Sequence, residues 1–136
     1  KRLNDGINEA AASVPKARKG VRVYFEIGAD GYAASESSHI GEILARLGAA
    51  NIVPGKLGTV PRLNPEFVVR ADPQLIMISA RTADTLAVRP GWARIGAVRD
   101  KRICAFSVLQ NDVIMRPGPR LDDAARLMAR CIRGEL

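Results

Sequence analysis

Three short apolar segments are separated along this chain by longer segments with helical periodicity. Residues 21–27 and 102–107 are rich in β-branched, aromatic and other apolar side chains, and residues 75–78 are apolar without interruption. A strand without polar alternation is typical of a parallel sheet that is covered on both faces. Because strands that alternate with helices are joined by βαβ units, the pattern predicts an α/β domain.

The first two helices are delimited by residues that start or stop a helix. An amphipathic helix near the N-terminus must stop at Pro15, because proline lacks the backbone donor that a helix needs. Ser37 or Ser38 can cap a second helix, which Gly48 ends. A short strand is expected next, at residues 51–53.

Two more helices follow from similar signals. Asn64 is suited to cap a helix and Pro65 to stand in its first turn, and this helix must end near residues 72–73. An apolar stripe over residues 121–132, closed by Gly134, predicts the last helix. The predicted fold is therefore α/β, a three-layer lobe with a mostly parallel central sheet flanked by helices.

Ligands of such sheets bind outside the carboxyl ends of the strands. Here those ends lead into three segments that we interpret as loops, namely 28–37, 79–82 and 107–118. A weaker helical segment is expected at 83–88, beyond the second loop. Any functional surface should lie on these loops.

Length and composition exclude several classes of protein. The 136 residues are enough for one domain, and 47% apolar with 26% charged residues is the balance of a globular chain. No apolar run approaches the ~18–20 residues of a membrane span. The net charge of +7 invites nucleic acid, but the arginines are spread out and aromatics are limited to three Phe, two Tyr and one Trp. A nucleic-acid surface concentrates its basic residues and adds aromatics for stacking, so we expect none.

Catalytic motifs are absent from the sequence. It contains no GxGxxG, Walker A, GxSxG or HExxH motif. The only histidine, His39, is spaced to form a metal site with Glu36 or Glu42, which would suit a metal-chelating enzyme. We favour a solvated first helical turn for His39, and expect no enzyme, no bound metal and no cofactor.

The two cysteines, Cys104 and Cys131, lie in an expected strand and on the inner face of the last helix. Their spacing fits no metal site, and both are expected to be buried as small hydrophobic residues. A disulfide between them is an alternative in an oxidising compartment, and the sequence leaves it open.

Several segments, taken in order, resemble the C-terminal lobe of class III periplasmic binding proteins, above all those that bind cobalamin. Residues 23–32 match the start of that lobe. Residues 38–52 are similar to its helix and following GG-x-N turn, with alanines in place of the glycines. Residues 61–76 resemble the family's stretch with a glutamate near a helix start, and RPGW at 89–92 and RPGPRL at 116–121 complete the match.

The resemblance implies a two-lobed protein with a ligand held between lobes that a long helix connects. Residues 1–19 would be the end of that helix and its linker, and residues 20–136 the C-terminal lobe. The N-terminal lobe would then be missing from this sequence. The implied function is the periplasmic substrate-binding component of an ABC importer for cobalamin. A ferric siderophore or haem is the alternative ligand, and a chelatase-like enzyme, which shares the fold, is a further alternative.

The resemblance also assigns roles to individual residues. Glu66 matches the glutamate that docks on the membrane permease, although an acidic residue also suits a helix start on its own. In the cleft-side loops, the residues expected to contact a ligand are Tyr32, Arg81, Asn111, Asp112 and Arg116. Of these, Arg116 has the stronger claim because it opens the RPGPRL segment, whereas Trp92 is expected to pack inside the lobe.

Overall fold

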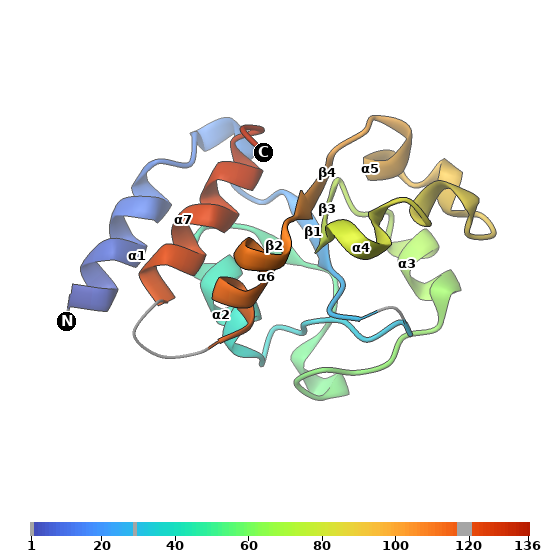
Figure 1. Cartoon of the computed structure of the whole chain (residues 1–136), viewed down its shortest axis with the longest axis horizontal. Helices are drawn as coiled ribbons and strands as arrows, with labels where there is room; N and C mark the ends of the chain where they lie inside the picture. The colour runs from blue at the N-terminus through green and yellow to red at the C-terminus, as the bar shows by residue number, and fades with distance from the viewer. Residues whose placement is uncertain (1, 29, 117–120) are drawn as a thin grey trace.

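A computed structural model describes residues 2–28, 30–116 and 121–136 of the chain (Figure 1). Its centre is a four-stranded sheet in the order β2-β1-β3-β4, and all three neighbouring pairs of strands are parallel. The strands are β1 (Arg22–Phe25), β2 (Ala50–Asn51), β3 (Leu75–Ser79) and β4 (Ile103–Phe106). The predicted parallel sheet is confirmed.

Helices cover both faces of this sheet, so the predicted three-layer lobe is also confirmed (Figure 1). One face carries α1 (Arg2–Ala12), α2 (His39–Arg46), α6 (Val108–Met115) and α7 (Leu121–Ile132). The other face carries α3 (Pro65–Ala71), α4 (Ala80–Ala83), α5 (Gly96–Arg99) and the short 3-10 helices η3 (Leu86–Val88) and η4 (Trp92–Arg94). Two further 3-10 helices, η1 (Lys16–Arg18) and η2 (Gly55–Leu57), lie in connections.

The side chains of the strands alternate between two hydrophobic clusters. Val23 and Phe25 pack with α1, α2, α6 and α7, whereas Tyr24, between them, packs with α3, η4 and α5. Met77 and Ile78 of β3 divide in the same way. Since both faces bury apolar side chains, the uninterrupted apolar run of β3 is explained.

Local signals set the helix ends as expected. Ser38, rather than Ser37, caps α2 and accepts a hydrogen bond from the Gly41 amide at 2.9 Å. Asn64 caps α3. At the other end of α3, Asp72 takes a left-handed conformation (φ 49°), and its carboxylate accepts a hydrogen bond from the Gly96 amide at 2.7 Å. This contact ties the end of α3 to the start of α5.

The prediction of a loop at residues 107–118 is wrong, because α6 occupies most of this segment. The cause is a capping box: the Ser107 hydroxyl accepts from the Gln110 amide, and the Gln110 side chain accepts from the Ser107 amide. Asn111 and Asp112 therefore stand on a helix rather than a loop. Residues 117–120 of the RPGPRL segment lie outside the described residues.

Three other boundaries differ from the sequence prediction. The loop prediction for residues 79–82 is wrong, because Ser79 caps α4 there, and the helical segment expected at 83–88 contains only the end of α4 and the short η3. The short strand lies at Ala50–Asn51 instead of 51–53, because the backbone amides of Ala50 and Ile52 bond to β1 and its approach. β1 ends at Phe25, since the next residue forms an isolated bridge to Ala33.

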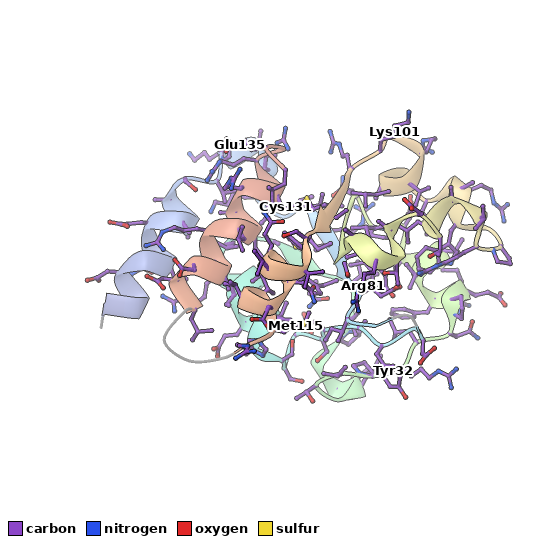
Figure 2. All side chains as sticks on the ribbon, viewed as in Figure 1. Tyr32, Arg81, Lys101, Met115, Cys131 and Glu135 are labelled. Carbon is purple, nitrogen blue, oxygen red and sulfur yellow. A yellow bond between two sulfur atoms is a disulfide. The ribbon has the colours of Figure 1, made fainter. Side chains whose placement is uncertain are left out.

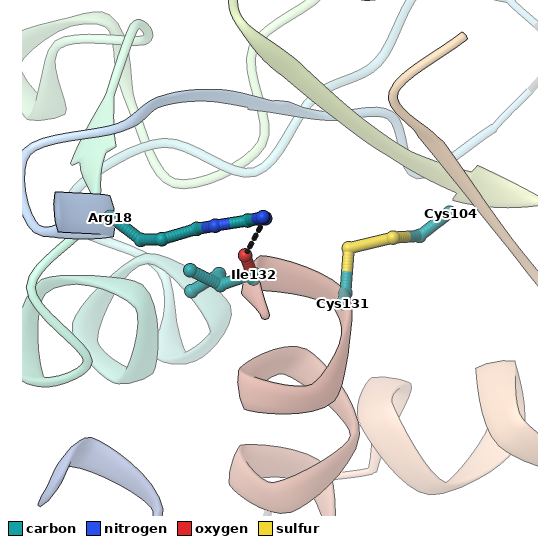
Figure 3. The surroundings of a disulfide bond; sticks show 4 residues. All are labelled: Arg18, Cys104, Cys131 and Ile132. Atoms are coloured by element: carbon teal, nitrogen blue, oxygen red, sulfur yellow. Dashed lines mark hydrogen bonds between the residues drawn. A yellow bond between two sulfur atoms is a disulfide. The ribbon is translucent and has the colours of Figure 1, made fainter. Parts of the chain in front are cut away.

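Cys104 and Cys131 are both buried and form a disulfide between β4 and α7, with an S–S distance of 2.02 Å (Figure 3). The carbonyl of Ile132, the next residue, accepts a hydrogen bond from Arg18 Nη1 at 2.8 Å. The end of α7 is thus held by β4 on one side and by η1 on the other. The disulfide, which the sequence left open as an alternative to two buried thiols, is therefore present in the structure.

The disulfide should contribute strongly to stability. It joins residues 27 apart, and closing a loop of that length lowers the conformational entropy of the unfolded chain, which stabilises the fold by about 3.5 kcal/mol. We expect the Cys104→Ala/Cys131→Ala variant to lose a free energy of unfolding of that size, measured by urea denaturation under oxidising conditions. Wild type in reductant is the control and should resemble the variant. Equal stability of the oxidised wild type and the variant would contradict the prediction.

Candidate functional site

Strands β1, β3 and β4 end at one edge of the sheet, because all of them run in the same direction. After β1 the chain turns to α2 on one face, whereas after β3 it turns to α4 and α5 on the other face. Between β1 and β3 the connections therefore leave in opposite directions. Such a switch point opens a crevice at the carboxyl edge, which is where α/β sheets bind ligands.

Tyr32 and Arg81 both lie near this edge, on the segments that follow β1 and β3. In Figure 2 they stand on the same side of the strands, and Lys101 stands on the opposite side. Tyr32 is 42% exposed, and its backbone pairs with that of Arg62. Arg81 is exposed in the first turn of α4, whose cap is Ser79.

The three other predicted contact residues are on or next to α6. Asn111 is half-buried, whereas Asp112 and Arg116 are exposed. Arg116 Nε donates to Asp112 Oδ1 at 3.0 Å, four residues earlier on the same helix. The charge of Arg116 is therefore balanced locally, and a ligand would meet an ion pair instead of a lone guanidinium.

Sequence analysis missed the two residues of α6 that are nearest to the end of β4. Val108 is 64% exposed and Leu109 is 80% exposed, although both are large and apolar. They form the first turn of α6, immediately after the cap residue Ser107. The capping box with Gln110 was the signal that would have placed them on a helix at the ligand edge.

A buried ion pair stands directly after β1. Glu26 is only 2% exposed, and its carboxylate accepts hydrogen bonds from Arg89 Nη1 at 2.7 Å and Nη2 at 2.8 Å. The Tyr24 hydroxyl donates to the same carboxylate at 2.8 Å. Arg89 also donates to the Thr85 hydroxyl and lies 4.6 Å from the centre of the Trp92 ring. Every member of the cluster is thereby held in one arrangement.

The electrostatics of this cluster follow from burial and from the carboxylate. Burial raises the pKa of Tyr24 above its usual range, and the negative charge of Glu26 raises it further. The hydrogen bonds to Glu26 raise the pKa of Arg89. The hydroxyl therefore stays protonated and the guanidinium stays charged over the physiological range.

The cluster lines a pocket of about 340 Å³ between the loop after β1 and the start of α3. Arg62, Leu63 and Pro65 also line it. Trp92 is buried, as expected, and its indole N–H has no hydrogen-bond partner in the described part of the chain. The lining of the pocket combines charged side chains with apolar ones, and the pocket adjoins the carboxyl edge at Glu26.

Glu66 stands in the first turn of α3 and is exposed. Its backbone amide donates to the side chain of the cap residue Asn64 at 3.0 Å. Its carboxylate makes no hydrogen bond or ion pair with any residue in the described ranges. The side chain is therefore free to meet a partner.

His39 is half-buried rather than solvated. Its Nε2 atom lies 3.1 Å from the Ile114 carbonyl, at hydrogen-bond distance, and so connects the start of α2 to the end of α6. Glu36 accepts a hydrogen bond from the Gly55 amide. Among the described residues no three His, Cys, Asp or Glu side chains gather in a way that would hold a metal ion.

Residues 1–106 match the family described as periplasmic binding proteins, and the chain belongs to this family. No helix in the described ranges is long and apolar enough to cross a bilayer. No curated protein is a significant match in sequence.

Solved structures with the same fold include several binding proteins. A possible iron-binding protein from Staphylococcus epidermidis is 22% identical, with a TM-score of 0.82 over 96% of this chain and 52% of its own. The haem-binding protein RhuT from Roseiflexus is 22% identical, with a TM-score of 0.76 over 98% and 53%. The vitamin B12 binding protein BtuF of Vibrio cholerae is 19% identical, with a TM-score of 0.74 over 98% and 51%. The chain thus spans about half the length of these proteins.

Removal of Arg89 should destabilise the lobe strongly, because it leaves the buried Glu26 carboxylate without its cation. We expect Arg89→Ala to lower the free energy of unfolding by about 3 kcal/mol or more in urea denaturation. The control is Arg99→Ala, which breaks an exposed pair with Asp100 and should cost less than about 1 kcal/mol. Similar losses in the two variants would contradict a structural role for the buried pair.

The raised pKa of Tyr24 predicts a loss of stability in alkali. The contribution of Tyr24 to the free energy of unfolding is complete below the unfolded-state pKa of about 10. It falls as the pH rises above that value, because Tyr24 then ionises only in the unfolded chain. Between about pH 9 and about pH 11, wild type should therefore lose more unfolding free energy than Tyr24→Phe. Parallel losses in urea denaturation would show that Tyr24 ionises in the folded state.

Proposed function

We propose that this chain is the C-terminal lobe of the substrate-binding component of an ABC importer. Residues 1–19 would end the helix that connects two lobes, and residues 20–136 would form the lobe. The observation that carries the proposal is the carboxyl edge of the sheet in a chain of this family. The topological switch point lies at this edge, and apolar side chains are exposed beside it. The structural comparison supports the proposal, since the chain matches about half of each neighbour.

The exposed residues at this edge suit a large, partly apolar ligand. Val108, Leu109 and Tyr32 present apolar surface that a ligand and a second lobe would cover. Arg81 and Asn111 supply hydrogen-bond donors for carboxylate or amide groups, and the Asp112–Arg116 pair supplies one charge of each sign. This mixture fits cobalamin, which carries its own axial base and peripheral amides.

The proposed location is the periplasm. The family is one of periplasmic proteins, and the Cys104–Cys131 disulfide is a bond that forms and persists in oxidising compartments. Delivery to a permease would use Glu66, whose unpaired, exposed carboxylate is suited to a transient charged contact. Bound ligand is cargo in this scheme, so none of these residues needs a catalytic role.

Ligand titrations of the full-length protein test this proposal. Calorimetry with cobalamin, haem and a ferric siderophore should show tight binding of one of them, and we expect cobalamin. Leu109→Asp should weaken that binding by about ten-fold or more, because a charge replaces a buried apolar contact. Val88→Asp is the control, since Val88 is 81% exposed, as Leu109 is 80% exposed, but does not follow a strand end.

Each outcome has a distinct meaning. Tight binding of haem or a siderophore would replace cobalamin and keep the importer role. Equal affinities of the Leu109→Asp and Val88→Asp variants would remove α6 from the ligand site. Failure of the whole panel to bind the full-length protein would contradict the proposed ligand class.

A further inference from the structure

A hollow of about 470 Å³ opens beside Glu66, between α3 and the turn that leads into η4. It lies on the face of the sheet opposite to α7. Glu66, Val69 and Arg70 line it from α3, Pro90 and Gly91 line it from the turn, and Arg94 lines it from η4.

Both walls of the hollow are held from behind. Val68 is buried and anchors α3, while Asn64 caps the start of the helix. Arg89 anchors the turn through its two hydrogen bonds to the buried Glu26. Trp92, also buried, holds the other end of the turn. The hollow is therefore preformed, and a partner would not have to order it.

Gly91 keeps the space between the walls open. Its φ is +81°, a left-handed conformation that favours glycine. A Cβ atom at this position would stand 3.7 Å from Val69 Cγ2, in van der Waals contact across the hollow. The absence of a side chain at Gly91 therefore preserves the depth of the hollow.

Three charged side chains line this hollow and have no partner among the residues that the structure describes. Glu66, Arg70 and Arg94 are all exposed, and none makes a side-chain hydrogen bond or an ion pair with a residue in the described ranges. Glu66 and Arg70 stand four residues apart on one helix, a spacing that often forms an ion pair, yet here they do not bond. The hollow thus presents one negative and two positive groups to whatever approaches it.

This arrangement constrains the partner of Glu66. A purely basic partner surface would attract the carboxylate but would meet Arg70 and Arg94 with like charge, which is costly at an interface. We propose that this hollow is a docking site for a permease surface that carries an acidic side chain next to the basic group that meets Glu66. The inference rests on the proposed function, and it adds Arg70 and Arg94 as residues that select the partner.

A protein partner fits this hollow better than an anionic membrane. A negatively charged lipid surface would attract the two arginines, but it would also repel the Glu66 carboxylate beside them. A flat bilayer would also fail to fill the hollow that Val69 and Pro90 line. A side chain that projects from a protein reaches into such a hollow.

The test measures association of the full-length protein with its reconstituted permease. Arg94→Glu and Arg70→Glu should each slow association about ten-fold at low salt, and less at about 500 mM salt, where charges are screened. Arg94→Ala should have a smaller effect of the same sign. Arg130→Glu is the matched control, because it changes the net charge equally from an exposed position on α7 and should change the rate less than about two-fold.

Ligand affinity of each variant should equal that of wild type, since these arginines make no side-chain bond to the described residues. Thermal unfolding should change little, with a small loss of stability for Arg70→Glu at the end of α3. If Arg94→Glu associates with the permease as fast as wild type or faster, the permease carries no acidic side chain opposite Arg94 and the inference is wrong. If Glu66→Ala still slows association in that case, the proposed importer role stands without the inference. Absence of any wild-type association would overturn both. If Arg94→Glu and Arg70→Glu lose the binding of wild type to phosphatidylglycerol vesicles but keep permease association, the partner of the hollow is a membrane and the proposal is wrong.

Discussion

All strands of the sheet run in one direction, the two central strands β1 and β3 are buried on both faces, and this constraint organises the rest of the lobe. Parallel strands need a crossover after each one, so helices must cover both faces and all carboxyl ends must meet at one edge. The crossovers after β1 and β3 go to opposite faces, so the two connections diverge at this edge. The surface proposed for the ligand is therefore a consequence of topology.

The Glu26–Arg89 pair supports both surfaces that we propose as functional. Glu26 stands directly after β1 at the ligand edge, and a buried carboxylate requires a cation and hydrogen bonds to be tolerated there. Arg89 satisfies it and thereby holds the turn that forms one wall of the hollow beside Glu66. A partner at the hollow and a ligand at the edge would thus contact elements joined by a single rigid contact.

Elements with strong local signals were predicted well from the sequence. The apolar run of β3, the cap and proline at Asn64 and Pro65, and the stripe of α7 each depend on neighbours only a few residues away. Helix α6 was missed because apolar residues occur on all sides of it, so it has no stripe. Its exposed side, at Val108 and Leu109, makes sense only once the end of β4 is placed beside it.

The sequence by itself determined the fold class and the direction of the strands, because periodicity and capping are local along the chain. The family was indicated by the resemblance of several segments taken in order, and the edge proposed for the ligand follows from the strand direction. Only the tertiary structure decided that Cys104 bonds to Cys131, that Arg89 reaches Glu26 across 63 residues, and that Arg94 faces the same hollow as Glu66. These pairings depend on how the crossovers stack helices on the sheet, and no short stretch of sequence encodes that stacking.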